Sequence, residues 1–505
     1  MFFPVVKLPK KMKLKELIES TGYAWHNKFC DFEVKGVTSD SRKISDGFIF
    51  VAIKGTAFDG HNFIQEAVQK GARAIIGSVD SSQLTAHRNI PYIRVDDSRK
   101  SLADLSAAFW GHPSSSLKLV GITGTNGKTT VSYLIESILR CAGCNPAVIG
   151  TINYRFKGQI FNAGNTTPGS AELQALLARM QKEKVDFVII EVSSHALDQE
   201  RVRAIKFSTG IFTNLSPEHL DYHRDLNSYF IAKSKLFKNL PREGFAILNI
   251  DDACAPELEK LTEAYVITYG LSNSAEVYVR DSRFSLEGME FTLCLRERTR
   301  KSFSGGINSI DIKSSLIGKH NLYNILAAAT FGLTQKIKPK ILKAGIEKVS
   351  GVPGRLERVS TGRDFYVFVD YAHTEDALKN AIASLRPLCK GRLCVVFGCG
   401  GNRDKSKRPK MGKVASELAD LAIVTSDNPR SEEPEKIIED IVSGISKQNF
   451  KVFPDRGEAI KQALSRAKKD DIILIAGKGH ENYQIFRDKI IHFDDREFVR
   501  EYLNR

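Results

Sequence analysis

Short apolar runs alternate with amphipathic stretches along most of this sequence. In the first hundred residues the apolar runs are Phe48–Ile53, Ala74–Ile76 and Tyr92–Val95, and stretches with helical spacing separate them. Similar runs continue through the rest of the chain: Leu117–Thr123, Val185–Ile190, Gly210–Thr213, Phe245–Asn249, Phe365–Asp370, Leu393–Phe397, Ala422–Ser426 and Ile472–Ala476. Strands that alternate with helices in this way predict parallel sheets with helices on both faces.

Two turn-rich segments divide this α/β pattern into three parts. A chain of 505 residues is longer than one hydrophobic core usually supports, so two or three domains are expected. The first break is the linker Trp110–Ser116, and the second lies near Gly351–Gly354. We therefore predict an N-terminal domain over residues 1–112, a central domain over 113–350 and a C-terminal domain over 351–505.

The charge balance changes this picture little. With 74 basic and 59 acidic residues, the net charge of +15 suits anionic partners such as nucleotides, although a solvated lysine-rich surface explains it equally well. No basic stretch is interleaved with aromatic residues, so nucleic-acid binding is not expected. Residues 1–13 lack the apolar run of a signal peptide, and no stretch reaches the roughly 20 apolar residues of a membrane span. A cytoplasmic protein is expected.

The eight cysteines are scattered along the chain, which favours reduced thiols over a disulfide framework. Cys141 and Cys144 form one CxxC pair, but no second pair follows at zinc spacing. We expect these two residues to lie on the back of a helix and not to bind a metal ion.

The strongest chemical signal is the glycine-rich turn between the run ending at Thr123 and the amphipathic stretch Thr129–Cys141. Glycine at 121, 124 and 127 lets backbone N–H groups approach phosphate oxygens, and the following helix adds its positive N-terminus. Lys128 supplies a point charge, and the Thr129 hydroxyl is a ligand suited to Mg²⁺. The strict phosphate-loop pattern requires glycine at 122, where this chain has isoleucine, so the turn is a variant.

A carboxylate follows the buried run that ends at Ile190. Glu191 stands at the carboxyl end of a strand expected to neighbour the glycine-rich turn, where a second Mg²⁺ ligand belongs. Without the turn it would be an ordinary acid at a strand end. Together the two motifs indicate a site for a nucleoside triphosphate and Mg²⁺.

With these motifs in order, the chain resembles the Mur ligase family, whose members join amino acids to UDP-muramoyl precursors at the expense of ATP. The resemblance spans roughly residues 36–486. It implies a central P-loop-type ATPase domain, an N-terminal UDP-binding domain and a C-terminal Rossmann-like domain. The nucleotide-contacting residues that it implies are Gly124, Thr125, Asn126, Gly127, Lys128, Thr129, Thr130, Asn321, Asn324, Arg355 and Asp370.

Within the family, the chain is most similar to the members that attach the third residue of the peptide. The motifs that carry this likeness are Thr38–Arg42, Asn165–Pro168, Glu191–Gln199, His219–His223 and Gly398–Lys405. By this likeness UDP-MurNAc-L-Ala-D-Glu would be held by Ser41, Thr166, Thr167, Ser193, Gln199 and Arg201. Hydroxyls and an arginine suit a polyanionic sugar nucleotide, although each alone would be a routine cap or surface group.

The resemblance also assigns a lysine and a histidine to the reaction centre. Lys233 corresponds to the family's carbamylated lysine, with Lys235 as the competing candidate, and His219 would be a further metal ligand. The implied catalytic residues are Lys128, Glu191, His219 and Lys233, and the implied metal ligands are Thr129, Glu191, His219 and Lys233.

The sequence 427–430 reads Asp-Asn-Pro-Arg, which in this family marks the enzymes that select meso-diaminopimelate. The physical reason is that a guanidinium can grip the second carboxylate of diaminopimelate through two hydrogen bonds, whereas lysine would leave Arg430 unpaired. The same likeness places the amino acid among Arg403, Asp427, Asn428, Arg430, Gly477 and Glu481. L-lysine remains the alternative amino acid.

The resemblance therefore implies a ligase that uses ATP and Mg²⁺, forms an acyl phosphate on the D-glutamate side chain and then joins it to the amine of diaminopimelate. Its expected partners are small molecules, and a monomer is expected. One rival is a folylpolyglutamate synthetase, which shares the ATP motif but lacks Thr38–Arg42 and the Asp-Asn-Pro-Arg motif. Another is a non-catalytic nucleotide-binding protein, which should have lost some of the four catalytic residues. The family often has proline where this chain has Glu375, which leaves a shifted turn there as one alternative.

Overall fold

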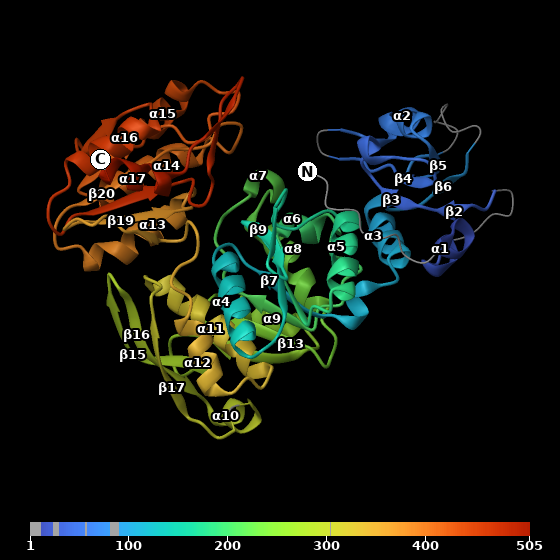
Figure 1. Cartoon of the computed structure of the whole chain (residues 1–505), viewed down its shortest axis with the longest axis horizontal. Coiled ribbons are helices and arrows are strands. Elements are labelled where there is room, and N and C mark those ends of the chain that lie inside the picture. Colours follow the sequence, from blue (N-terminus) through green and yellow to red (C-terminus); the bar gives the residue numbers. More distant parts are fainter. Residues whose placement is uncertain (1–11, 24–29, 56–57, 81–89, 304, 505) are drawn as a thin grey trace.

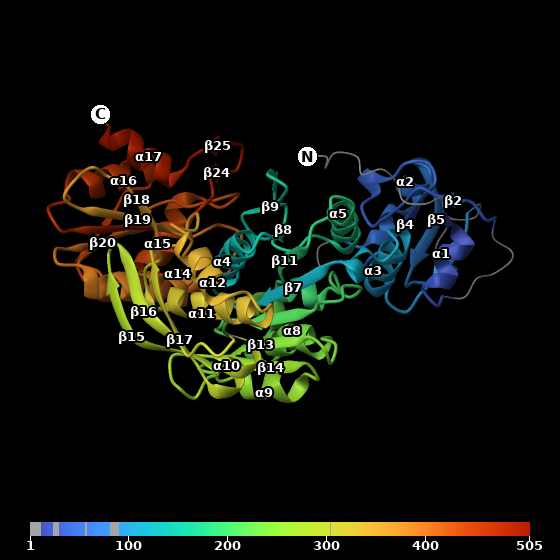
Figure 2. The same ribbon diagram turned by 60° about the horizontal axis from the view of Figure 1, so that its bottom comes forward.

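The computed structural model describes residues 12–23, 30–55, 58–80, 90–303 and 305–504. Three α/β units follow one another along the chain, each built on its own sheet. In both Figure 1 and Figure 2 the central unit lies between the N-terminal and the C-terminal unit. The predicted α/β class is confirmed. Among the described residues, no helix combines the length and apolarity needed to cross a membrane.

The N-terminal unit is a parallel sheet with the order β3 (Gly36–Thr38), β4 (Phe48–Val51), β5 (Ala72–Gly77) and β6 (Tyr92–Arg94). One face packs on α1 (Leu14–Ser20) and α3 (Ser98–Phe109), and the other on α2 (Ile64–Gln69). The three apolar runs of the sequence form three adjacent strands. Helices cover both faces of this sheet, which explains why these strands are continuous apolar runs.

The central unit is an eleven-stranded sheet whose middle is parallel. Its parallel strands are, in spatial order, β8 (Pro146–Ile149), β11 (Phe187–Glu191), β7 (Lys118–Thr123), β12 (Thr209–Phe212), β13 (Phe245–Asn249), β14 (Tyr265–Tyr269) and β15 (Val277–Ser285). One face is covered by α4 (Lys128–Cys141), α11 (Lys319–Thr334) and α12 (Pro339–Glu347). The other face is covered by α5 (Ser170–Lys182), α8 (Leu226–Lys238) and α9 (Ala255–Leu261).

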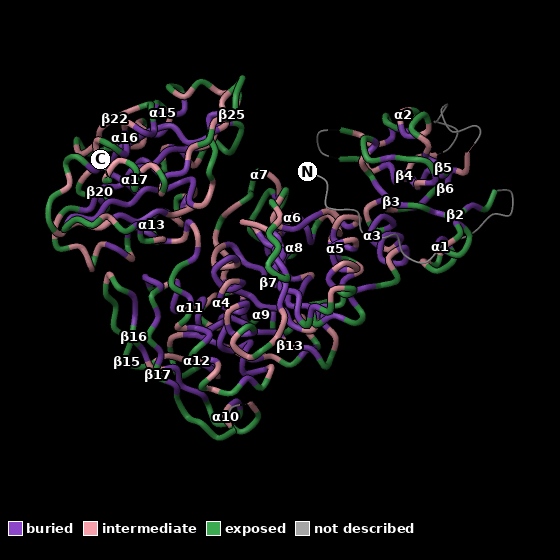
Figure 3. Tube along the Cα trace, in the orientation of Figure 1, coloured by how far each residue is buried: buried purple, intermediate pink, exposed green. Residues whose placement is uncertain are grey.

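Antiparallel strands extend this sheet at both edges, which the sequence analysis did not predict. They are β9 (Asn153–Phe156) and β10 (Gln159–Asn162) at one edge, and β16 (Gly288–Leu295) and β17 (Ser309–Ser314) at the other. Strand β15 is exposed over most of its length, as the green trace in Figure 3 shows, so it lacks the apolar run of a buried strand. At the tip of the β15–β16 hairpin, Leu286 packs against the core of the C-terminal unit.

The C-terminal unit is a six-stranded sheet. Its order is β18 (Glu357–Val359), β19 (Tyr366–Asp370), β23 (Ile472–Ala476), β20 (Leu393–Phe397), β21 (Leu421–Val424) and β22 (Phe450–Val452), and only β18 runs antiparallel. Helices α13 (Glu375–Leu385), α14 (Lys407–Leu418) and α15 (Pro434–Val442) cover one face, and α16 (Arg456–Ser465) and α17 (Asp495–Leu503) the other. Helix α13 begins at Glu375, a first-turn position that proline also favours, so glutamate is compatible with the start of the helix.

The cysteine pair is only partly where the sequence analysis placed it. Cys141 is the last residue of α4, whereas Cys144 lies beyond the end of that helix. Both side chains are partly buried and reduced. The described residues contain no cluster of three or more histidine, cysteine, aspartate or glutamate side chains arranged for a metal ion.

Close packing of α12 against α4 generates a stability prediction. A Cβ atom on Gly345 would lie 2.5 Å from the Cα of Ile138 in α4, so the two helices would have to separate. We expect Gly345→Ala to destabilise the protein by about 1–3 kcal/mol, although alanine stabilises an exposed helix by about 0.5–1 kcal/mol relative to glycine. Thermal unfolding measures the effect. The control is Gly351→Ala, where the new Cβ meets no atom within 4 Å; an unchanged midpoint for Gly345→Ala would contradict the prediction.

Candidate active site

The glycine-rich turn connects β7 to α4 and requires left-handed backbone at two positions. Gly124 has φ of 146° and Gly127 has φ of 90°, and a Cβ on either would collide with Thr213 or Asn324. Gly121 has a different role, because it lies within β7, where a Cβ would come 2.9 Å from Leu236. Two of the three spaced glycines therefore shape the turn, and the third makes room for packing.

Two lysine ammonium groups converge on one carbonyl oxygen of this turn. The Nζ atoms of Lys128 and Lys233 each donate to the Gly124 oxygen at 2.8 Å, and Lys128 also donates to the Thr125 oxygen at 2.8 Å. Burial lowers the pKa of Lys128, and it lowers the pKa of Lys233 far below its ordinary value, with the Lys128 charge adding to the effect. Lys233 is 1% exposed. A buried amine that readily loses its proton is therefore placed beside the turn.

Lys235, the competing candidate, points to a different region. Its Nζ donates to the Leu197 oxygen at 3.4 Å and to Glu200 at 3.3 Å. The amine of Lys233 contacts the turn, with its Nζ 4.4 Å from the centre of the Tyr229 ring. The geometry thus favours Lys233 for a role at the turn.

Glu191 is held at the end of β11 by hydrogen bonds from Thr129, from Thr151 and, at 3.5 Å, from Ser132. Its Oε2 accepts from Thr129 Oγ1 at 2.9 Å and from Thr151 Oγ1 at 2.8 Å, and its Oε1 accepts from the Thr151 N–H at 3.2 Å. The sequence analysis missed Thr151, which follows β8, the neighbouring parallel strand. A hydroxyl residue just beyond an adjacent strand was the available signal, because the carboxyl ends of parallel strands meet at one edge.

Five of the six residues assigned to the UDP-muramoyl peptide lie together around Glu191. Thr167 donates to the Glu191 carbonyl at 2.7 Å and accepts from the Ser193 N–H at 3.1 Å, and Thr166 lies 3.2 Å from Thr151. Arg201 donates to the Thr167 carbonyl at 2.9 Å and to Gln199 at 2.7 Å and 3.0 Å.

The sixth residue belongs to the N-terminal unit. Ser41 begins a short helical turn over Ser41–Lys43, and its hydroxyl donates to Glu66 at 3.0 Å. The charge of Lys43, in the same turn, lowers the pKa of Glu172 in α5, although burial outweighs it and raises that pKa overall. The turn of Ser41 therefore lies near the α5 side of the site.

The residues assigned to the nucleotide surround the other side of the turn. Asn324, whose Oδ1 lies beside Gly127, donates to Asn321 at 2.9 Å. Arg355 donates through Nη2 to Thr129 Oγ1 at 3.4 Å and stacks over Tyr371. Its buried Nε has no hydrogen-bond partner among the described residues. A buried guanidinium N–H left unsatisfied beside a phosphate-type turn is a donor for an anionic ligand.

Asp370 accepts hydrogen bonds from the backbone next to this arginine and at the end of its own strand. Its carboxylate accepts from the N–H of Leu356 at 2.6 Å and of Ala372 at 2.8 Å. Burial raises its pKa, and the charge of Arg355 partly offsets this. The residue ties β19 to the segment that carries Arg355.

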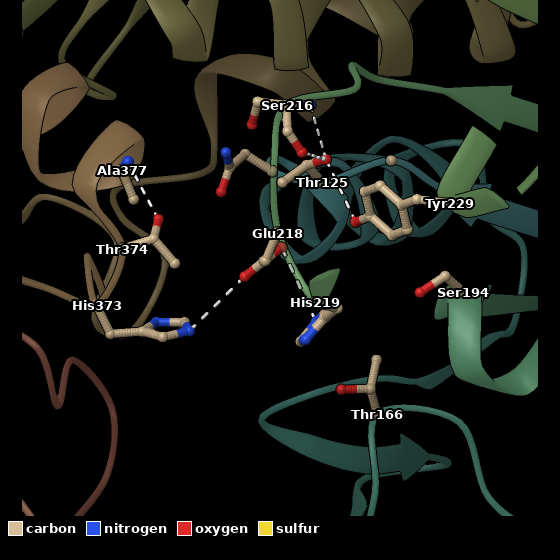
Figure 4. A network of polar contacts seen from close by, with 12 residues as sticks. Thr125, Thr166, Ser194, Ser216, Glu218, His219, Tyr229, His373, Thr374 and Ala377 are labelled. Atoms are coloured by element: carbon tan, nitrogen blue, oxygen red, sulfur yellow. Dashed lines mark hydrogen bonds and ion pairs between the residues drawn. The ribbon is translucent and has the colours of Figure 1, made fainter. Parts of the chain in front are cut away.

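Glu218 of the central unit, which was not predicted, lies where the C-terminal unit approaches the turn. Glu218 lies 3.9 Å from His219 and 3.8 Å from His373 of the C-terminal unit, as Figure 4 shows. Burial would raise the pKa of Glu218, but the neighbouring histidines and lysines lower it below its ordinary value. Nearby, Asp376 accepts from Ser216 at 3.1 Å and from Asn126 at 3.5 Å. Acidic residues therefore link the phosphate-type turn to the third unit.

His219 has a strained backbone and a partly exposed ring. Its φ is 57°, and its ring centroid lies 4.8 Å from that of His195 and 6.4 Å from that of Tyr229. Lys233 lies against the same tyrosine, so His219 and Lys233 are both neighbours of Tyr229.

All six residues assigned to the amino acid lie in one cluster at the carboxyl ends of β20, β21 and β23. Asn428 donates to Glu481 at 2.7 Å, and a Cβ on Gly477 would lie 2.6 Å from Asp427 Oδ2. A Cβ on Gly400 would lie 2.8 Å from Arg430 Nη1 and 3.9 Å from Arg403 Cγ, so the two arginines flank that glycine.

Two buried residues of this cluster were not predicted. Lys478 is fully buried, with its Nζ 3.7 Å from Glu481, and Gln484 donates to the Asp427 carbonyl at 2.8 Å. Burial raises the pKa of Glu481, and the charge of Asp427 adds to the effect. Lys478 lies within the Gly-Lys-Gly-His-Glu sequence of residues 477–481, so a lysine between two glycines was the available signal.

Models of three Mur ligase domains match the chain in order. They are the Mur ligase family catalytic domain over residues 33–110, the Mur ligase middle domain over 122–332 and the Mur ligase glutamate ligase domain over 354–479. The chain is also 44% identical to UDP-N-acetylmuramoyl-L-alanyl-D-glutamate--2,6-diaminopimelate ligase 1 of Clostridium acetobutylicum, an alignment that covers 97% of this chain and 99% of that protein. A Clostridium tetani ligase of that name, without the numeral, is 43% identical over the same shares. The chain belongs to the Mur ligase family.

Solved structures agree with this assignment. A structure of a UDP-N-acetylmuramoyl-L-alanyl-D-glutamate--2,6-diaminopimelate ligase has a TM-score of 0.66 at 32% identity and covers 94% of this chain and 95% of its own. MurF from Acinetobacter baumannii has a TM-score of 0.67 at 18% identity, covers 99% of this chain and 100% of its own, and shares the fold.

The contact of α11 with the C-terminal unit generates a prediction on pH. His320 Nδ1 lies 3.2 Å from Ser384 Oγ, and burial lowers the pKa of this histidine to about 4. The unfolded chain binds this proton more readily, so the contribution of His320 is present above its ordinary pKa of about 6.5 and is lost as the pH falls towards 4. Between pH 7 and pH 5 that loss amounts to about 2 kcal/mol.

We therefore expect His320→Gln to lose less stability on acidification than the parent protein. Urea unfolding at pH 7 and at pH 5 compares the two, because every other titrating group is common to both. If the parent and the variant lost equal stability over this range, His320 would not be the source.

Proposed function

We propose that this protein is an ATP-dependent ligase that joins meso-diaminopimelate to the D-glutamate side-chain carboxylate of UDP-MurNAc-L-Ala-D-Glu, a step of peptidoglycan precursor synthesis. The main support for the proposal is the contact between the C-terminal unit and the phosphate-type turn. Arg355 reaches Thr129, and Asp376 reaches Asn126 and Ser216. A transferred phosphoryl group would thus lie between the unit that binds ATP and the unit that binds the amino acid.

Oxygen ligands beside the turn fit a Mg²⁺ ion. Thr129 Oγ1 and Glu191 Oε2 lie 2.9 Å apart, and Mg²⁺ commonly takes one or two protein oxygens together with substrate phosphates. A bound Mg²⁺ would offset negative charge on the transferring phosphoryl group. His219 and Lys233 are the further ligands that we propose. Lys233 would serve as an anionic ligand after carbamylation, which its buried and readily deprotonated amine favours.

The proposed reaction has two steps. A carboxylate oxygen of D-glutamate attacks the γ-phosphorus of ATP, the bond to the β-phosphate oxygen breaks, and an acyl phosphate and ADP form. The amine of diaminopimelate then attacks the acyl carbon, gives up a proton, and inorganic phosphate leaves. Lys128 leaves the turn carbonyls to contact the γ-phosphate, and the unpaired Nε of Arg355 donates to a phosphate oxygen. Thr166, Thr167 and Arg201 position the muramoyl peptide beside Glu191.

The amino-acid cluster supports diaminopimelate over lysine. Arg403 and Arg430 would hold the distal carboxylate, while Asp427 and Glu481 would receive the distal ammonium group. Lysine has the ammonium group but no carboxylate there, so binding it would leave two guanidinium groups unpaired.

Lys128→Ala tests the core of the proposal. We expect ATP-dependent ligation to fall by about 10²–10³-fold, because a cation that offsets charge on the transferring phosphoryl group is lost. Phosphate release with ATP, UDP-MurNAc-L-Ala-D-Glu and meso-diaminopimelate is the measurement. Lys118→Ala is the matched control, since Lys118 is an exposed lysine at the opposite end of β7. Ligation at the parental rate by Lys128→Ala, or phosphate release by the parent with any one substrate alone, would count against the mechanism.

Arg430→Ala tests the choice of amino acid. We expect kcat/KM for meso-diaminopimelate to fall by about 10²-fold or more, while kcat/KM for L-lysine stays constant or rises, because a hydrogen-bonded carboxylate partner is removed from one amino acid only. The ratio of the two values, measured on the parent and the variant, reports the selectivity. A parent enzyme that preferred L-lysine would overturn the assignment.

A further inference from the structure

A buried arginine outside the proposed amino-acid site binds a carboxylate that joins two loops of that site, residues 398–403 and residues 427–432. The side chain of Arg408, in α14, is 1% exposed and pairs with two carboxylates. Its Nη1 donates to Glu432 Oε2 at 3.0 Å and to Asp440 Oδ2 at 2.8 Å, and its Nη2 donates to Glu432 Oε1 at 3.0 Å. A buried guanidinium is costly unless its partners are well placed, so this pair fixes the position of Glu432 firmly.

Glu432 passes this constraint to the loop that follows β20. Its Oε1 accepts a hydrogen bond from the backbone N–H of Asn402. The side chain of Asn402 in turn accepts from the Ser431 N–H at 3.2 Å and from the Ser431 hydroxyl at 2.9 Å. The Glu432 carboxylate and the Asn402 amide therefore hydrogen-bond residues 398–403 to residues 427–432. We call this pair of side chains the clamp.

The two clamped loops carry the two arginines of the proposed pocket. Arg430 Nη1 donates to the Gly401 carbonyl at 2.8 Å, and the Gly401 N–H donates to the Asn428 carbonyl at 2.9 Å. Arg403 lies one residue beyond Asn402, whose N–H is held by Glu432. A shift of one loop against the other would therefore change the distance between the two guanidinium groups.

We infer that Arg408 and Glu432 are positioning residues that set the spacing of Arg403 and Arg430, and thereby the selectivity for an amino acid with a second carboxylate. This inference rests on the proposed function. Since two guanidinium groups can both bind one carboxylate only at a defined spacing, loss of the clamp weakens binding of the distal carboxylate. An amino acid with no distal carboxylate does not use that spacing, so its binding stays unchanged.

The second partner of Arg408 provides a matched control. Asp440 lies in α15, and its described hydrogen bond from Arg408 does not involve either loop. Its side chain is also 47% exposed, compared with 19% for Glu432. Glu432→Ala and Asp440→Ala each remove one carboxylate from the same arginine, but only Glu432→Ala also removes a hydrogen bond between the two loops.

The experiment varies each substrate in turn for the full-length parent and the two variants, and follows phosphate release. For Glu432→Ala we expect the KM for meso-diaminopimelate to rise about tenfold, while kcat, and the KM values for ATP and for UDP-MurNAc-L-Ala-D-Glu, stay within about twofold. The kcat/KM for L-lysine should stay constant, so selectivity falls. Asp440→Ala should keep the parental KM for all three substrates even where thermal unfolding shows lower stability.

Several outcomes would overturn the inference. Equal changes in the KM for meso-diaminopimelate in the two variants, or a uniform change for all substrates in Glu432→Ala, would reduce Arg408 to a stabilising residue. If Glu432→Ala does not fold, Glu432→Gln is the variant to test, since it keeps one acceptor oxygen. Its KM for meso-diaminopimelate should rise about threefold. An unchanged KM would refute the inference. A parent enzyme inactive with meso-diaminopimelate would instead remove the proposed function itself.

Discussion

The site depends on the backbone of the turn between β7 and α4. Left-handed conformations at Gly124 and Gly127 bring the turn against Thr213 and Asn324, so neither position has space for a side chain. The same path leaves the carbonyl oxygen of Gly124 facing inwards, where two lysine ammonium groups bind it. The turn carbonyls therefore hold both lysine side chains in the absence of a phosphate, and Lys128 must exchange these contacts for the phosphate when ATP binds.

The parallel sheets explain why residues distant in sequence meet. In the central unit, Glu191 and the turn follow adjacent strands, so they share one edge of the sheet. In the C-terminal unit, Asp427 and Gly477 likewise lie just beyond parallel strands, at the edge where α13 contributes Asp376 to the central unit. Two sheets thus present their carboxyl edges to one another. This arrangement brings the phosphate-type turn into contact with the unit that carries the cluster around Asn428.

Sequence reasoning succeeded where a residue's role follows from its strand or turn. The buried strands and the turn were predictable because apolar runs and glycine spacing indicate them directly, whereas the cluster around Asn428 was predicted from the resemblance to the Mur ligase family. Contacts between units were not predictable, since Glu218 meets His373 only when the third unit is in place. The antiparallel edges were missed for a different reason: an exposed edge strand such as β10 has no apolar run. Arg408 was missed because a buried arginine looks like any helix arginine until its partners are known.

The β15–β16 hairpin has a consequence for movement of the C-terminal unit. Its tip residue Leu286 packs on the apolar core of that unit, and Arg358 adds a long hydrogen bond of 3.5 Å to the Leu286 carbonyl and an ion pair of 4.0 Å to Glu287. Apolar contact has no preferred direction, whereas hydrogen bonds lose strength when they rotate. A change in the orientation of the C-terminal unit would therefore cost less at this apolar contact than at a contact made mainly of hydrogen bonds.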